Sequence, residues 1–136
     1  MQRKTQQAAG YDLTATAGGS VGPGLAVNVP LDLWGKDIPW PKPWGLKGYG
    51  FYGKLEMRSK WANSHRLVVL GGVIDSDYMG KVVLMMVNLG LELFEWQAGT
   101  GLCQMIVLSY AVLDGDGVDT VRTGGFGSTD TPPNIG

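Results

Sequence analysis

Two carboxylates and a phenol lie between two apolar segments near the middle of the chain. Residues 70–80 read LGGVIDSDYMG, with apolar residues leading in from 67 to 70 and leading out from 82 to 87. This pattern predicts two strands joined by a hairpin. Asp75 directly follows two β-branched residues, so it ends a strand, where a catalytic group is held more firmly than on a free loop. A purely structural alternative is that Asp75 and Asp77 cap the backbone amides of the turn.

Cations and hydroxyl groups gather in the segment before this hairpin. They are Lys54, Arg58, Ser59, Lys60, Ser64 and Arg66. Residues 59–65 are the best candidate for a short helix, and a helix start with a serine beside an arginine suits phosphate oxygens. The alternative is a solvated basic turn. His65 has no second His or Cys at ligand spacing, which favours a structural role over a metal site.

A glycine-rich tail closes the chain. Its residues are too polar to build a core, so we expect residues 122–136 to be flexible. The tail nevertheless carries Arg122, Phe126, Ser128 and Thr129. Glycine amides can wrap an anion, and an aromatic ring can stack on a planar base. This combination predicts a flap that closes over a nucleotide.

The composition indicates one all-β domain. A chain of 136 residues with 44% hydrophobic content can bury a single core, which we assign to residues 1–121. Glycine occurs 22 times, between short β-branched runs, and this usage is typical of strands joined by tight turns. We expect strands at residues 8–13, 25–31, 51–57, 91–96 and 102–113, and a fully buried strand at residues 82–87.

Charge and cysteine content restrict the partners and the compartment. A net charge of −1 argues against a protein that binds nucleic-acid backbone. The sequence has no apolar run of ~18 residues and no secretory signal pattern, so we expect no membrane span and a cytoplasmic protein, or a nuclear one in a eukaryotic or viral setting. Cys103 has no cysteine partner within the chain and lies in an apolar run, which predicts a small buried core residue in a reducing compartment.

Residues 34–50, WGKDIPWPKPWGLKGYG, interrupt the strand pattern. Proline at this density excludes a helix and a central strand, so we expect a stiff excursion. Its three tryptophans either contact an unknown protein partner or fold back onto the body of the domain as a small cluster.

Five motifs in order resemble those of the homotrimeric deoxyuridine triphosphatases (dUTPases). They are AGYDL at residues 9–13, Arg58-Ser59 with Ala62, GVIDSDY at 72–78 with Gly80, residues 99–104, and Arg122 with GGFGST at 124–129. The resemblance implies a distorted jelly-roll β-barrel with at most one short helix. It also implies hydrolysis of dUTP to dUMP and pyrophosphate with Mg²⁺, by attack of water on the α-phosphorus.

The resemblance also implies a role for each matching residue. Asp75 would hold and deprotonate the attacking water, and Tyr78 would pack under the deoxyribose and reject a 2′-hydroxyl. Asp12 would support magnesium-bound waters, and the backbone around Gly72 and Val83 would read uracil. The remaining substrate-binding residues fall into two groups, one for the phosphate chain and one in the tail: Arg58, Ser59 and Gln104; Arg122, Phe126, Gly127, Ser128 and Thr129.

Three departures from the family pattern stand in this sequence. Met57 and Lys60 replace a proline and a small residue of the second motif. The fourth motif reads GTGLCQ, without its usual arginine, which removes a supporting salt bridge but keeps Gln104. The fifth motif is one residue shorter between Arg122 and its double glycine. The excursion at 34–50 has no counterpart in the family pattern.

The resemblance also implies an assembly, and two alternative functions remain open for the chain. In the family, subunits of a trimer share active sites, so we expect Asp75 and Phe126 of one chain to serve different sites. The alternatives are a regulatory or protein-interaction module of reduced activity that uses the tryptophan-rich excursion, and a related deaminase acting on dCTP. Retention of Asp75, Tyr78 and Phe126 together favours the hydrolase.

Overall fold

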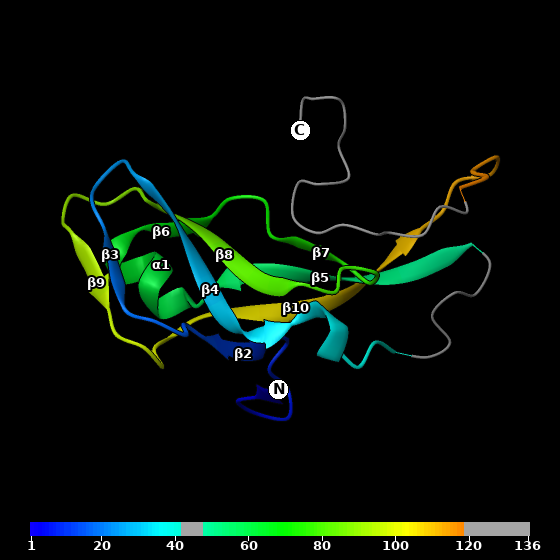
Figure 1. Ribbon diagram of the computed structural model, residues 1–136, viewed down its shortest axis with the longest axis horizontal. Coiled ribbons are helices and arrows are strands. Elements are labelled where there is room, and N and C mark those ends of the chain that lie inside the picture. Colours follow the sequence, from blue (N-terminus) through cyan, green and yellow to red (C-terminus); the bar gives the residue numbers. More distant parts are fainter. Residues whose placement is uncertain (42–47, 119–136) are drawn as a thin grey trace.

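The computed structural model describes residues 1–41 and 48–118, and these form ten strands, one α-helix and one 3₁₀ turn (Figure 1). The elements in chain order are β1 (Gln2–Arg3), β2 (Tyr11–Thr14), β3 (Gly19–Val21), β4 (Ala26–Trp34), η1 (Gly35–Asp37), β5 (Tyr49–Met57), α1 (Ser59–His65), β6 (Leu67–Val69), β7 (Val73–Asp75), β8 (Lys81–Asn88), β9 (Phe94–Trp96) and β10 (Gly101–Ala111). The predicted all-β class with one short helix is confirmed.

Two main sheets enclose the core. The larger has the strand order β1-β2-β10-β5-β7, and the smaller has the order β4-β8-β6, while β3 and β9 form a separate pair. Strand β10 is the centre of the larger sheet because it pairs with β2 on one side and with β5 over the nine positions from Cys103 to Ala111 on the other. Side chains from both sheets, including Leu13, Leu55, Leu84 and Met105, join in one buried cluster.

Alternating burial in β4 confirms the strand pattern expected there. Val29, Leu31 and Leu33 are buried, while Pro30 and Asp32 between them are exposed, as is Asn28 before them. Apolar residues at every second position therefore face the core, as the period of a strand requires.

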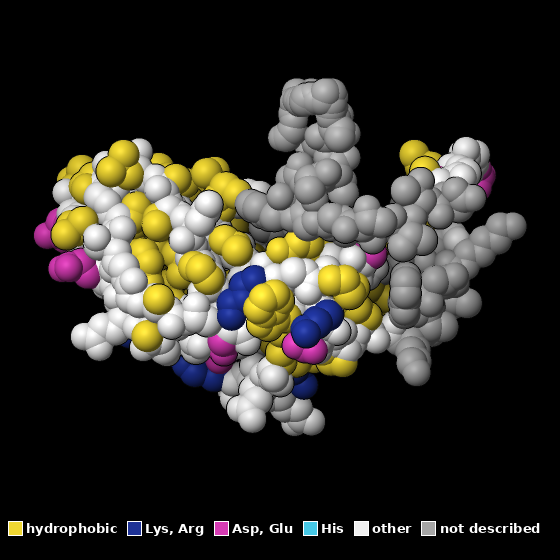
Figure 2. Space-filling model, viewed as in Figure 1, with side chains coloured by type: hydrophobic (Ala, Val, Ile, Leu, Met, Phe, Trp, Pro, Cys, Tyr) yellow, Lys and Arg dark blue, Asp and Glu magenta, His cyan; other side chains and the backbone are white. Residues whose placement is uncertain are grey.

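Strand β8 corrects the expectation of full burial. Val82, Leu84 and Met86 are buried, but Val83 and Met85 on the opposite face are only half-buried. The sequence suggested full burial because both faces of the strand are apolar. The outer face instead belongs to an apolar surface over β4, β6 and β8 (Figure 2), to which exposed Val68 and other side chains contribute.

The central hairpin is also more complex than expected. Strands β6 and β8 pair antiparallel, with Leu67 opposite Asn88. Between them, however, β7 crosses to the larger sheet and pairs with β5, which places Asp75 opposite Tyr52. Asp75 does end a strand, as predicted, but that strand belongs to a different sheet from β6 and β8.

Three boundaries differ from those expected. Strand β9 covers only Phe94–Trp96, and Leu91 before it is 95% exposed. The excursion is shorter than predicted, because β4 extends to Trp34 and β5 begins at Tyr49. Among its tryptophans, Trp40 packs against the core and Trp34 is 46% exposed. The third tryptophan, Trp44, lies outside the described residues.

Candidate active site

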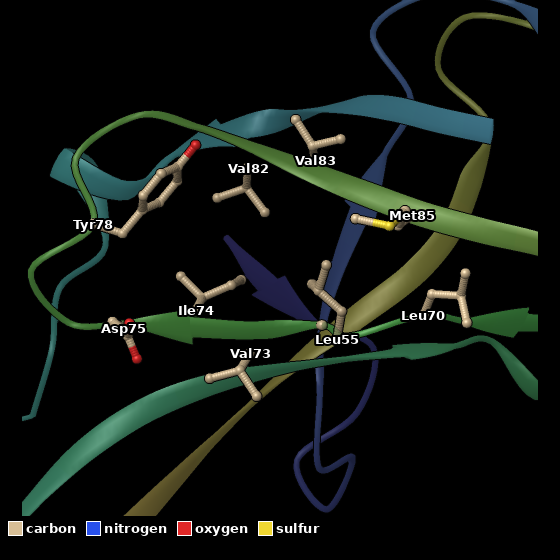
Figure 3. A pocket seen from close by; sticks show the side chains of 10 residues that line it. Leu55, Leu70, Val73, Ile74, Asp75, Tyr78, Val82, Val83 and Met85 are labelled. Atoms are coloured by element: carbon tan, nitrogen blue, oxygen red, sulfur yellow. The ribbon is translucent and has the colours of Figure 1, made fainter. Parts of the chain in front are cut away.

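A cavity of about 130 Å³ opens where β7 and β8 diverge (Figure 3). Most of the side chains that line it are apolar, and a carboxylate and a phenol lie at one end: Leu55, Leu70, Gly72, Val73, Ile74, Asp75, Tyr78, Val82, Val83 and Met85. Ile74 and Val82 point toward each other across the space between the two strands. Sites for small molecules are commonly lined by apolar side chains with a few polar groups placed among them.

Backbone edges line this cavity on two sides. Strand β7 is the edge of its sheet, paired with β5 alone, and β6 pairs with β8 only from Met86 onward. Within the described residues, no strand therefore joins Val73–Asp75 to the first half of β8. Amide and carbonyl groups on these edges can form hydrogen bonds to a base, as they would to a neighbouring strand.

Two glycines turn the chain into β7. Gly71 and Gly72 have φ values of 67° and 93°, in the left-handed region that favours glycine. The Gly72 carbonyl accepts a hydrogen bond of 2.8 Å from the Leu55 amide, which fixes the turn to β5. A Cβ on Gly72 would also lie 3.0 Å from Val69 Cγ1, so the position is constrained by both conformation and space.

Tyr78 lies on the turn that leaves β7. Its amide donates to the Asp75 carbonyl over 3.0 Å, and its hydroxyl donates to the Lys81 carbonyl over 2.6 Å. The ring is half-buried and packs against the core. Asp75 and Tyr78 therefore belong to one tight turn beside the cavity.

The predicted phosphate-binding residues gather elsewhere, where β2, β5 and β10 lie side by side. Gln104 pairs with Asp12 on one side and with Glu56 on the other. The Gln104 side chain lies over Gly10, where an added Cβ would come within 2.8 Å of Gln104 Cβ. Arg58 follows β5 directly, and its amide donates to the Leu102 carbonyl over 3.1 Å.

Helix α1 starts at Ser59, as predicted, and is fastened to the altered fourth motif. Trp61 Nε1 donates to the Gly101 carbonyl over 2.9 Å. Arg58 covers the same glycine, because a Cβ on Gly101 would lie 2.8 Å from Arg58 Nη1. These two contacts connect the helix to the fourth motif, which lacks the arginine usual in the family pattern.

One chain does not bring the two groups of residues together. Asp75 is opposite Tyr52, and Arg58 comes six residues after Tyr52, just past the end of β5. At ~3.3 Å per residue, this separates Asp75 from Arg58 by roughly 20 Å. Asp75, at one end of the cavity, and the cluster of Arg58, Ser59, Gln104 and Asp12 are therefore two separate groups of predicted site residues, which we call half-sites. The cavity also reaches Leu55, three residues before Arg58.

Cys103 is a core residue and not a nucleophile. Its side chain is fully buried, and burial, with smaller contributions from Asp32 and Asp12, raises the pKa of the thiol to about 12. A thiol with such a pKa is protonated at neutral pH and has no thiolate to react.

The described residues offer no cluster of three or more His, Cys, Asp or Glu that could hold a metal ion by themselves. They likewise contain no helix long and apolar enough to cross a bilayer. The tail residues Arg122, Phe126, Gly127, Ser128 and Thr129 lie outside the described part of the chain.

Several cavity residues were missed by the sequence analysis. Leu55, Leu70, Val82 and Met85 line the cavity beside the predicted Gly72 and Val83. The adjacent pair Val82-Val83 could have indicated an apolar surface outside the core, because neighbouring residues on a strand face opposite sides and one of the two had to face outward. Leu55 gave no signal, because its approach to Gly72 depends on the pairing of β5 with β7.

Comparison with known proteins gives the same family from sequence and from structure. The dUTPase family model matches residues 1–130. The chain is 34% identical to a deoxyuridine 5′-triphosphate nucleotidohydrolase of Mus musculus, over 93% of this chain and 75% of the relative. It is 35% identical to the same enzyme of avian adenovirus 8, over 94% of this chain and 76% of that relative.

Two solved structures are similar in fold. The dUTPase from Streptococcus mutans superposes with a TM-score of 0.64 at 26% identity, covering 84% of this chain and 88% of that one. The native EIAV dUTPase superposes with a TM-score of 0.66 at 20% identity, covering 95% and 92%. The matching motifs, the cavity between β7 and β8 and the extent of these similarities lead to one conclusion: the chain belongs to the dUTPase family.

Proposed function

We propose that the protein is a dUTP diphosphatase, which hydrolyses dUTP to dUMP and pyrophosphate. The observation that carries this proposal is the small cavity between two backbone edges, with Asp75 and Tyr78 on one turn at its mouth. Uracil would lie between β7 and β8 and form hydrogen bonds with the backbone around Gly72 and Val83. The relatives from Mus musculus and avian adenovirus 8 carry the name of this activity.

Asp75 and Tyr78 act on neighbouring parts of the substrate. Asp75 holds the attacking water and accepts its proton, which is the task of a general base close to the reacting phosphorus. Tyr78 packs under the deoxyribose and leaves no room for a 2′-hydroxyl. Phosphoryl-type transfer asks the protein mainly for positioning and charge neutralisation, and both half-sites supply these.

A complete site takes its half-sites from different subunits. Because roughly 20 Å separates Asp75 from Arg58 along β5, a triphosphate held by one cannot reach the other in the same chain. A homotrimer with shared sites solves this problem by placing Arg58, Ser59 and Gln104 of one subunit against Asp75 of the next. The exposed apolar surface over β4, β6 and β8 is a surface that such an assembly would cover.

The residues fit a magnesium ion that arrives with the substrate. Mg²⁺ keeps several waters and favours phosphate oxygens together with one or two carboxylates. Asp12 lies beside Gln104 on the adjacent strand and can accept hydrogen bonds from metal-bound waters. When bound, the ion would neutralise charge on the triphosphate, while Arg58, Ser59 and Gln104 hold its oxygens. The tail would then close the site, with Phe126 on uracil and Arg122, Ser128 and Thr129 on the γ-phosphate.

Asp75→Asn tests the activity, with Asp77→Asn as the matched control. Pyrophosphate release is measured with dUTP, dCTP and dTTP in the presence of Mg²⁺. We expect the parent to release pyrophosphate from dUTP and not from dCTP or dTTP. For dUTP, kcat should fall by two orders of magnitude or more in Asp75→Asn and change by only a few-fold in Asp77→Asn. An unchanged kcat in Asp75→Asn would remove this residue from the mechanism, and release from dCTP or dTTP at the same rate would contradict the substrate.

Subunit mixing tests the shared site. Asp75→Asn chains and Arg58→Ala chains, each inactive alone, are unfolded together and refolded. A site with an intact Asp75 and an intact Arg58 then forms in roughly a quarter of random pairings. Mixed trimers, verified by native mass spectrometry, that stay at background activity would show that one chain supplies both residues.

A further inference from the structure

The base of the excursion lies directly against the turn that carries Tyr78. Beyond Trp34 the chain continues to pair with the loop before β8. The Gly35 amide donates to the Gly80 carbonyl over 2.6 Å, and the Lys36 amide donates to the Met79 carbonyl over 3.2 Å. These two hydrogen bonds join η1 to the segment that follows Tyr78.

An irregularity in β4 makes this contact. Pro30 is opposite Val83 and Trp34 is opposite Lys81, so four steps along β4 match only two steps along β8. The extra residues in β4 place Trp34 opposite Lys81. The Lys81 carbonyl accepts the hydrogen bond from the Tyr78 hydroxyl. Lys81 is also held from the side, with its Nζ 5.4 Å from the centre of the Trp34 ring.

Gly35 leaves no space between the two segments. It is buried, and a Cβ placed on it would lie 2.7 Å from the carbonyl carbon of Tyr78 and 3.0 Å from Cδ2 of its ring. A Cβ at 2.7 Å from a backbone atom cannot be accommodated by a side-chain rotation. Any side chain at position 35 would therefore push the backbone and the ring of Tyr78 away.

Gly35 cannot retreat from this contact. On one side it continues β4, and on the other the Ile38 amide donates to the Gly35 carbonyl over 3.2 Å. Ile38 is buried in the core, and Trp40 beyond it packs against the same cluster. The base of the excursion is thus anchored at both ends, so a side chain at position 35 would press directly on the turn that carries Tyr78.

We propose that Gly35 is a positioning residue for Tyr78, so that the base of the excursion sets the sugar selectivity of the site. The proposal rests on the role of Tyr78 in the proposed function. It concerns a residue outside the five motifs of the family pattern and assigns a task to the base of the excursion. A displacement of a site group by about 1 Å can change a rate by two orders of magnitude.

Gly35→Ala tests the proposal, with Gly22→Ala as the matched control. A Cβ on Gly22 meets only Leu25 Cδ1, at an ordinary 3.5 Å. We measure kcat and KM for dUTP and for UTP, together with the thermal midpoint. For Gly35→Ala we expect the preference for dUTP over UTP to fall by about tenfold or more, and for Gly22→Ala we expect the parental preference. A folded Gly35→Ala enzyme with the parental preference would overturn the proposal.

A double-mutant cycle with Tyr78→Ala separates this proposal from the proposed function. If Gly35 acts through the Tyr78 ring, Gly35→Ala changes the preference little once that ring is absent. Additive effects would overturn the positioning role, whatever Tyr78 itself does. An unchanged preference in the single Tyr78→Ala variant would instead refute sugar selection by Tyr78.

Ile38→Val decides the question where Gly35→Ala fails to fold. This substitution removes one methylene from the anchor of η1 and keeps the glycine. A smaller loss of dUTP preference in the same direction supports the positioning role. A parental preference, with a lowered thermal midpoint to show that the anchor was loosened, overturns it.

Discussion

Asn88, at the end of β8, holds together three segments that meet beside the smaller sheet. Its side chain is fully buried and uses both ends of the amide. Nδ2 donates to the Val21 carbonyl over 3.0 Å and to the Glu92 carbonyl over 2.8 Å, and Oδ1 accepts from the Gly90 amide over 2.8 Å. Replacing Asn88 by alanine removes all three hydrogen bonds at once.

The expected cost follows from the burial of each hydrogen bond. The bonds to Glu92 and Gly90 are partly buried, so water can replace them and each contributes ~1 kcal/mol. The bond to Val21 is buried, so its loss leaves a carbonyl without a partner at a cost of ~1–3 kcal/mol. Asn88→Ala should therefore lower the free energy of unfolding by about 3–5 kcal/mol.

Urea unfolding at a fixed protein concentration measures this change, because assembly makes apparent stability depend on concentration. Asn28→Ala is the matched control, since Asn28 is exposed on β4, and it should change the free energy of unfolding by no more than ~0.5 kcal/mol. A loss below ~1 kcal/mol in Asn88→Ala would refute the assignment of three working hydrogen bonds. Asn88→Asp keeps the acceptor but turns an oxygen toward two carbonyls, so it should also be destabilised.

Three further predictions concern the core, a half-site and the excursion. Cys103 should resist iodoacetamide at pH 8 until the protein unfolds. The pKa of the folded thiol, about 12, exceeds the unfolded value of 9.0. The contribution of Cys103 to stability is therefore complete below pH 9 and is lost as the pH rises toward 12. Urea titrations of the parent and of Cys103→Ala over this pH range would detect the loss. Gly10→Ala should displace Gln104 and raise KM for dUTP, while Gly22→Ala should not. Replacing residues 42–47 by glycine and serine should leave kcat/KM for dUTP within a few-fold of the parent value. Replacing residues 36–48 also removes Lys36 and Ile38, and it should lower the preference for dUTP over UTP measured from the kcat/KM values of the two substrates.

Local patterns in the sequence were sufficient for several elements. Helix α1 matches its predicted range because it ends at His65. Arg66 follows in the left-handed conformation, with a φ of 56°, and an apolar run begins after it. Strand β4 was predictable because polar and apolar residues alternate in it. In each case the residue pattern that predicts the element lies within a few residues of it, and tertiary contacts favour the same secondary structure.

Contacts between distant segments account for what the sequence did not predict. Strand β7 has three residues, and nothing in them indicates whether they pair with β8, nearby in sequence, or with β5, as they do. The contact of Gly35 with Tyr78 depends on the same kind of information, since it follows from a register shift between β4 and β8. A glycine in a proline-rich segment looks like an ordinary turn residue until its neighbour across the fold is known.

The pairing of β5 with β7 also supports the proposed sharing of sites between subunits, because it limits how far conformational change can bring Asp75 and Arg58 of one chain together. Strand β5 carries Tyr52, opposite Asp75, and leads directly into Arg58, so the two half-sites are attached to one strand. That strand pairs with β10 over nine consecutive positions. Shortening the roughly 20 Å between the half-sites would require breaking this ladder at the centre of the larger sheet. A second subunit can supply the missing half without any such cost, so we expect activity to be lost on dissociation even where the separated chains keep their β-sheet circular dichroism.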